Sequence, residues 1–103
     1  MIPADEFLKG LEEKPVLYYI YCYFDKKLNR WNQPVIDTNE PAFIHESTVA
    51  SIAKGKFPAE QCLDLDLVFL GTFDLKTGHF DIFEEPRIIV DCERVLKGDK
   101  VDA

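Results

Sequence analysis

Two apolar runs of similar length dominate the pattern of hydrophobic and polar positions along the chain. The first extends from Leu17 to Phe24 and the second from Leu65 to Phe73. Both are rich in tyrosine, valine, isoleucine or phenylalanine, which favour β-strands. In the first run both alternating faces are apolar, which is typical of a strand covered on two sides. The pattern therefore predicts two strands and places the first in the middle of a sheet.

A polar phrase with one order of residue types follows each apolar run. An aromatic residue, Asp, Lys, then Asn or Gly, then a basic residue or His, and a second aromatic residue occur over 24–31 and again over 73–80. Asn29 and Gly78 suit the positive φ that tight turns require. Each phrase therefore predicts the turn of a β-hairpin.

The two returning strands differ in their pattern. The first begins at Trp31, and Pro34 indicates that it ends there or lies at a sheet edge. In the second, Phe80 and Ile82 share one face, whereas His79, Asp81 and Phe83 share the other. This alternation predicts a strand with one solvated face.

A helix is predicted between the hairpins, from Glu40 to Lys54. Thr38 or Asn39 is expected to cap it, Pro41 suits its first turn, and Gly55 ends it. The expected apolar stripe consists of Ala42, His45, Val49, Ile52 and Ala53. Residues 57–61 are expected to form a connecting loop.

The segment after the second hairpin leaves two alternatives open. Cys92, Val95 and Leu96 fit a short helix that ends at Gly98, whereas the β-branched residues over 88–90 favour a strand. Residues 1–15 form a polar leader, read either as a short helix or as a frayed terminus, and residues 99–103 are expected to be a flexible tail.

These elements predict a single α+β domain over residues 16–98. Its antiparallel sheet is built from two β-hairpins and covered on one face by the α-helix, in the order ββαββ with a short C-terminal helix or strand. The repeated phrase also suggests a duplicated strand–strand–helix unit.

Composition narrows the classes of partner. The chain has 103 residues, of which 47% are hydrophobic, and 19 acidic against 12 basic residues give a net charge of −7. General binding to duplex DNA is disfavoured, because affinity for DNA comes largely from neutralising phosphates. An acidic chain favours solubility or a basic protein partner.

The cysteines and the apolar runs indicate in which cellular compartment the protein is expected. The three cysteines form no CxxC pair, which excludes a zinc knuckle and a thioredoxin-type motif. Free buried thiols fit a reducing cytoplasm. The start of the chain lacks the pattern of a signal peptide, and the longest apolar run is too short to cross a bilayer. We therefore expect a cytoplasmic protein without membrane contact.

No constellation of residues indicates catalysis. His45 has no second histidine at ligand spacing and is expected to be hydrogen-bonded to a neighbour. The acidic pairs at 64 and 66 and at 84 and 85 are expected to be solvated at strand ends. Gly-rich phosphate loops and the HExxH motif are absent from the sequence. We expect no catalytic residue, no metal, no cofactor and no enzymatic activity.

Two surfaces are candidates for binding. Basic side chains beside aromatic ones at the hairpin turns resemble the way single-stranded nucleic acids are held. The candidate nucleic-acid-binding residues are Lys26, Lys27, Arg30, Trp31, Lys76 and His79. If the opposite face of the first strand meets the helix, an apolar patch is left for a homodimer or a partner protein. The residues of this candidate interface are Leu17, Tyr19, Tyr21 and Tyr23.

The order of these signals resembles the small nonstructural protein of microviruses, the gokushovirus-type single-stranded DNA phages. The residues that carry the resemblance are Phe24, Asp25, Lys27, Gln33, Pro34, Pro58, Leu67, Gly71, Phe73, Asp74, Thr77, Gly78 and Pro86. The sharpest part is the stretch 70–78. Residues 1–14 look like an addition to the family pattern, and the predicted helix lacks the arginine that such proteins often carry there.

The resemblance implies a role without enzymatic activity. Such proteins are associated with phage DNA replication or with packaging of DNA into the procapsid. The expected function is therefore a non-enzymatic phage accessory protein that contacts a viral or host protein in the host bacterial cytoplasm. The alternative is a protein that binds single-stranded nucleic acid through its hairpin turns.

Overall fold

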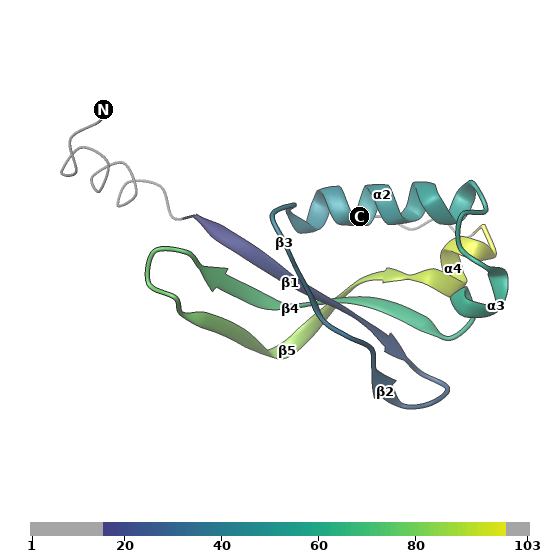
Figure 1. Cartoon of the computed structure of the whole chain (residues 1–103). Helices are drawn as coiled ribbons and strands as arrows, with labels where there is room; N and C mark the ends of the chain where they lie inside the picture. The colour runs from purple at the N-terminus through teal and green to yellow at the C-terminus, as the bar shows by residue number, and fades with distance from the viewer. Residues whose placement is uncertain (1–15, 99–103) are drawn as a thin grey trace.

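The computed structural model describes residues 16–98 (Figure 1). This part of the chain is an α+β structure with a five-stranded antiparallel sheet and three helices. The elements in chain order are β1 (Leu17–Asp25), β2 (Arg30–Trp31), β3 (Val35–Asp37), α2 (Pro41–Ala53), α3 (Ala59–Cys62), β4 (Leu65–Asp74), β5 (Phe80–Asp91) and α4 (Cys92–Leu96). The leader predicted over 1–15 and the tail predicted over 99–103 lie outside the described residues.

The sheet has the strand order β2-β1-β4-β5, with β3 also paired to β1. β1 is therefore central, as its two apolar faces predicted. The returning strand of the first hairpin is split into two pieces. β2 pairs with the end of β1, and β3 pairs with the middle of β1. Pro34 lies in the break between them, where it removes a ladder N–H group. Three strands rather than two thus precede the helix, which departs from the predicted order ββαββ.

Both predicted turns form, and in each of them the side chain of the repeated aspartate accepts a hydrogen bond from a backbone N–H group. The Oδ1 atom of Asp25 accepts a hydrogen bond of 3.0 Å from the backbone N–H of Leu28, and that of Asp74 accepts one of 2.8 Å from Lys76. Asn29 and Gly78 adopt positive φ, at 53° and 74°. The shared phrase is thus explained by shared turn geometry.

Helix α2 begins at Pro41 and its C-terminus lies beside Gly55, which has a φ of 73°. The expected cap by Thr38 or Asn39 is wrong: Glu40 holds the N-cap position and makes no side-chain cap hydrogen bond. Residues Ala59–Cys62 form the short helix α3, where a loop was expected.

The two alternatives for the C-terminal segment both occur, one after the other. β5 continues through Asp91, and α4 follows at once. Asp91 makes this switch possible, because its carboxylate accepts a hydrogen bond of 3.3 Å from the backbone N–H of Arg94 and caps α4. Within β5 the pairing with β4 is interrupted between Ile82 and Arg87.

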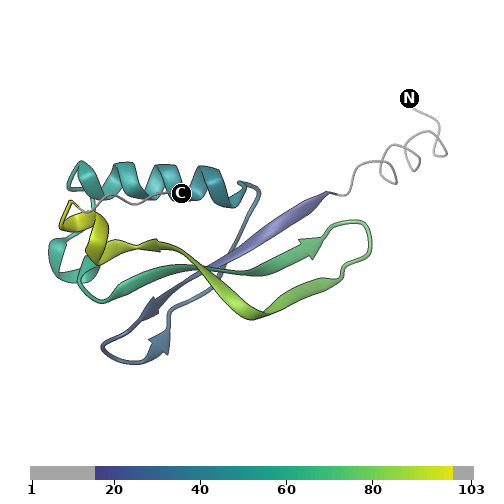
Figure 2. The same cartoon turned by 180° about the vertical axis from the view of Figure 1, so that it is seen from behind.

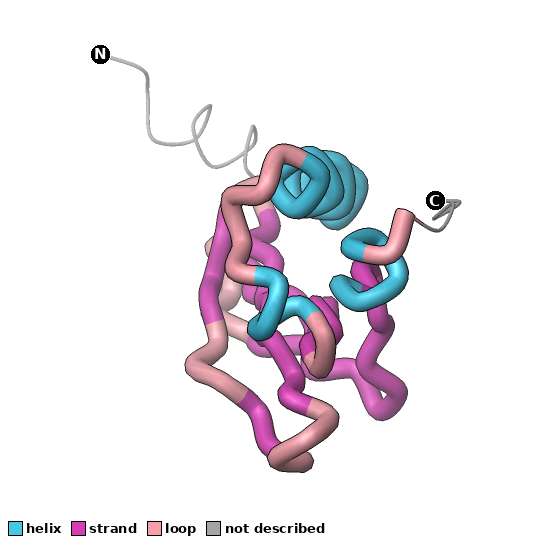
Figure 3. The backbone as a smooth tube through the Cα atoms, turned by 90° about the vertical axis from the view of Figure 1, so that its right-hand side faces the viewer, coloured by secondary structure: helices cyan, strands magenta, loops and turns pink. Residues whose placement is uncertain are grey.

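The main core lies between the helices and one face of the sheet. Figures 1 and 2 show α2 running along one side of the strands, and Figure 3 shows it end-on with α4 beside it. The buried cluster consists of Tyr21, Ile52, Cys62, Leu67, Phe69, Val90 and Cys92. All three helices and the three longest strands contribute to it.

Candidate functional site

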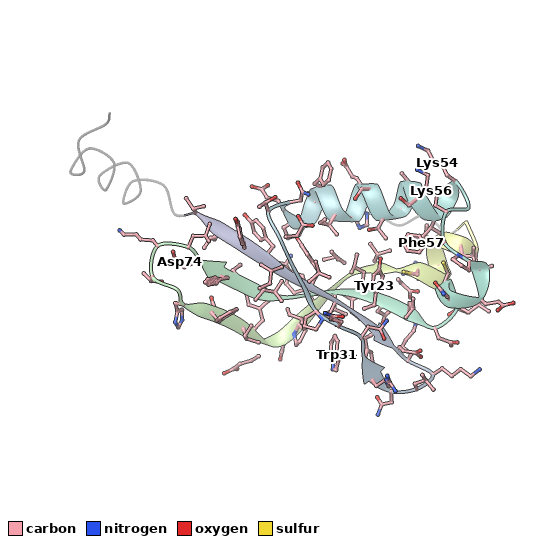
Figure 4. All side chains as sticks on the ribbon, viewed as in Figure 1. Tyr23, Trp31, Lys54, Lys56, Phe57 and Asp74 are labelled. Carbon is pink, nitrogen blue, oxygen red and sulfur yellow. The ribbon has the colours of Figure 1, made fainter. Side chains whose placement is uncertain are left out.

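The tyrosine face of β1 is turned toward the helices. Tyr21 is only 4% exposed, and its ring centroid lies 5.5 Å from that of Phe69. Tyr23 packs edge-on against Phe57 on the same side of the sheet (Figure 4). The prediction of an exposed partner interface at Leu17, Tyr19, Tyr21 and Tyr23 is therefore wrong, because this is the face that meets α2.

Tyr21 can be buried because its hydroxyl group has a partner. The hydroxyl donates a hydrogen bond of 2.7 Å to the backbone oxygen of Asn39, just before α2. Burial, together with the negative charge of Asp37, holds the pKa of Tyr21 above its ordinary value. The bond ties the start of the helix to the central strand.

The opposite face of the sheet carries exposed apolar side chains. We call it the open face and define it by five residues: Trp31, Ile36, Phe80, Ile82 and Ile88. Direct strand pairing puts them on one side of the sheet, because paired residues share a face. Figure 4 shows Trp31 on this side, away from α2.

The register links the open face into continuous rows. Ile36 pairs with Ile20, Ile20 with Gly71, and Gly71 with Ile82. A second row joins Cys22, Val68 and Ile88. Ile20, Cys22 and Val68 are buried, yet they do not belong to the cluster under the helices. They form a second apolar layer, sheltered by the exposed side chains around them.

Aromatic pairs lie at both ends of the open face. The rings of Phe24 and Trp31 are 4.8 Å apart, and those of Phe73 and Phe80 are 4.6 Å apart. Phe80 and Ile82 lie on the solvated face of β5, where both are more than half exposed. Phe83 lies on the other face, where its ring centroid is 4.9 Å from that of Phe69.

The first hairpin turn holds four of the six candidate nucleic-acid-binding residues. Lys26 is occupied by acidic partners: its Nζ atom lies 3.4 Å from Oδ1 of Asp66 and 3.9 Å from Oδ1 of Asp91. Lys27 and Arg30 are exposed, and within residues 16–98 neither forms an ion pair. Both precede Trp31 in the chain, and Trp31 is 46% exposed.

The ion pair of Lys26 and Asp66 is partly withdrawn from water. Burial raises the pKa of Asp66 above its ordinary value, and the positive charge of Lys26 offsets part of that rise. Burial alone would lower the pKa of Lys26, but Asp66 and Asp91 outweigh it and hold this pKa above its ordinary value. The expectation of a solvated carboxylate at position 66 is therefore wrong.

The second hairpin turn lies at the other end of the sheet. Asp25 pairs with Leu65 at the start of β4, whereas Leu17 pairs with Asp74 at its end. A strand of this length spans about 33 Å. The exposed side chains of Lys76 and His79 are therefore not brought together with those of Lys27 and Arg30, and the six residues form two separate sites rather than one patch.

His45 and the three cysteines are part of the packing. His45 makes the hydrogen bond to a neighbour that was expected, with Nδ1 2.6 Å from the backbone oxygen of Ile89. All three cysteines are free and buried. Burial raises the pKa of Cys22 and Cys62, and it raises the pKa of Cys92 to about 12. Among the described residues, no three His, Cys, Asp or Glu side chains are placed to hold a metal ion.

Sequence reasoning missed most of the open face. Trp31 was singled out for its ring, but Ile36, Ile82 and Ile88 were not considered as a surface. The available signal was the apolar character of both faces of β1, combined with a single predicted helix that can cover one of them.

Comparison with known proteins gives one family. A family model described as "Phage ORF5 protein" matches residues 18–95, from β1 into α4. The curated proteins and the solved structures contain no match to this chain. Within residues 16–98, none of the helices is both long enough and apolar enough to cross a membrane.

Proposed function

This chain belongs to the phage ORF5 protein family, and we propose from that premise that it is a non-enzymatic accessory protein of a microvirus-type phage. It acts in the host cytoplasm by binding another protein during viral DNA replication or packaging. The family match supports the phage setting, and the motif over 70–78 supports the microvirus assignment.

The open face is the observation that supports action through protein contact. Exposed apolar side chains gathered on one face mark interaction surfaces in soluble proteins. In contrast, the groups with shifted pKa values are explained by packing: the cysteines are buried thiols, and Tyr21 and Asp66 have internal partners. Such groups support a structural role rather than a catalytic one.

The test is to express the tagged chain in phage-infected and uninfected host cells, crosslink, and identify what is recovered. We expect a viral replication or procapsid protein in the infected cells only. A phage that lacks the gene should show a loss either of intracellular genome copies or of DNA-filled particles. Recovery of nothing but untagged copies of the chain, with normal phage growth, would overturn the proposed function.

A second candidate function is the binding of single-stranded nucleic acid at the first hairpin turn. The exposed ring of Trp31, next to Arg30 in the chain, favours it, because such a pair can stack on a base and contact a phosphate. Trp31 is the single tryptophan of the chain, so its fluorescence reports binding directly. Quenching by an oligonucleotide at low salt, lost on combined Lys27→Ala and Arg30→Ala substitution, would support this function. Unchanged fluorescence would exclude it.

A further inference from the structure

We propose that the open face is the docking site for a second copy of this chain, in a two-fold dimer with the two sheets packed face to face. This inference goes beyond the proposed function, because it assigns the open face to a second copy of the chain, and the resulting dimer is the form that would meet the viral or host protein. It is tested on the purified protein, so that its failure and that of the proposed function are separable.

The size of the face fits such a dimer. The three long strands, at about 4.8 Å spacing and about 3.3 Å for each of roughly ten residues, give roughly 500 Å² of sheet, to which β2 and β3 add two short stretches. Protruding rings and branched side chains enlarge the accessible area beyond this value. A standard interface buries about 800 Å² on each partner. With these side chains included, the area of the open face approaches that of a standard interface.

Charge favours a second copy over a basic partner. The whole chain carries a net charge of −7, yet the five residues of the open face carry no charge. The carboxylate of Asp66, which lies at one end of this face, is already paired with Lys26. The apolar parts of two such faces can approach each other without repulsion between like charges, whereas a basic partner would find there only the carboxylates of Asp66 and Asp91, which Lys26 already contacts.

Light scattering on the eluting full-length chain, over a range of concentrations, tests the proposal. We expect a dimer for the wild type and at least a tenfold weaker dimer for Ile82→Lys, because the substitution buries a charge in the interface. Phe43→Lys is the matched control, since Phe43 lies on α2 and is as exposed as Ile82, both at 56%. This variant should dimerise like the wild type.

Trp31 gives a second measurement that needs no substitution. Its ring lies on the open face, so its emission should shift to shorter wavelength as the concentration rises and the dimer forms. A wild type that stays monomeric at about 1 mM would overturn the proposal. Equal weakening by Ile82→Lys and Phe43→Lys would overturn it too, as would a dimer whose formation leaves the emission of Trp31 unchanged.

Discussion

Lys26 contacts the carboxylate of Asp66, with Nζ 3.4 Å from Oδ1, and thereby joins the first hairpin turn to β4. The side chain of Asp66 is only 8% exposed, whereas that of Lys26 is 38% exposed. A carboxylate this deep in a protein needs a partner for its charge. The lysine that looked like a phosphate ligand in the sequence is therefore part of the structure of the turn.

Replacing Lys26 with Met should destabilise the protein by about 1–3 kcal/mol at neutral pH, because Asp66 then stays buried without its partner. The loss should shrink as the pH is lowered. Burial holds the pKa of Asp66 above its ordinary value, so stability linked to its proton is present at low pH and lost as the pH rises through the folded-state pKa. Urea unfolding at neutral and at acidic pH measures both effects.

Lys27→Met is the control for this prediction, since Lys27 is exposed and should change stability by less than about 0.5 kcal/mol. Equal losses for the two variants, or a loss for Lys26→Met that is independent of pH, would contradict the assigned ion pair.

Substituting Gly71 with Ala should destabilise the sheet by about 1–3 kcal/mol, or more. A Cβ atom there would press against the backbone oxygen of Asp81 and lie 2.9 Å from the Cα atom of Ile82. Since both contacts are with backbone, β5 must move away. Thermal unfolding followed by circular dichroism measures the change.

Gly78→Ala is the comparison for Gly71→Ala, because glycine is needed at position 78 for its positive φ and not for lack of space. Its φ is 74° and a Cβ atom would meet nothing within 4 Å, so only backbone strain of about 1 kcal/mol is expected. If Gly78→Ala cost more than Gly71→Ala, the close approach of β5 at Gly71 would be refuted.

Removal of the hydroxyl group in Tyr21→Phe should cost about 0.5–1.5 kcal/mol, since the hydrogen bond to Asn39 is lost. The same group makes the fold sensitive to alkali. Its pKa is raised on folding, so the linked stability is present below about pH 10 and lost as the pH rises further. Ultraviolet titration of the tyrosines should show late ionisation for Tyr21 and also for Tyr23, because burial raises both pKa values, and the late step should be smaller in Tyr21→Phe.

Tyr18→Phe is the comparison for this prediction, because within the described residues the hydroxyl group of Tyr18 has no hydrogen-bond partner. Its removal should cost less stability than Tyr21→Phe does. A larger loss of stability in Tyr18→Phe than in Tyr21→Phe would show that the assigned hydrogen bond is wrong.

All three thiols should resist Ellman's reagent in the native protein and react fully in urea. Each cysteine is buried, and burial raises each thiol pKa, for Cys92 to about 12. The reactive species is the thiolate, which is therefore scarce at neutral pH. Spectrophotometric counting of released thiolate checks this. Rapid reaction of even one thiol in the native state would contradict the described packing.

The sequence predicted those parts of the fold that local chemistry decides. Asp25 and Asp74 specified the two turns, Gly55 the end of α2, and the apolar faces of β1 its central place. The sequence predicted that the first returning strand ends at Pro34 or lies at an edge. It did not predict that β3 pairs with β1 after Pro34, because this pairing depends on the path of the chain into α2. Asp91 was not recognised as the cap that converts β5 into α4.

The candidate site was harder to predict, because it depends on which side of the sheet the helix covers. The alternation in β1 correctly separated Tyr21 from Cys22, but both faces were apolar, so the pattern did not decide between them. The hydroxyl partner of Tyr21 at Asn39 is a tertiary contact and leaves no local signal. The spacing of Lys26 from Asp66 likewise follows only from the register of β1 and β4.

The interrupted stretch of β5 limits the kind of assembly that the open face can form. β5 is an edge strand, and exposed strand edges can recruit further strands into open-ended fibrils. Glu84 and Glu85 would set like charges against an arriving copy, and Pro86 has no N–H group to offer it. Growth along this edge is therefore disfavoured, so that contact through the open face ends in a closed pair rather than in a fibril.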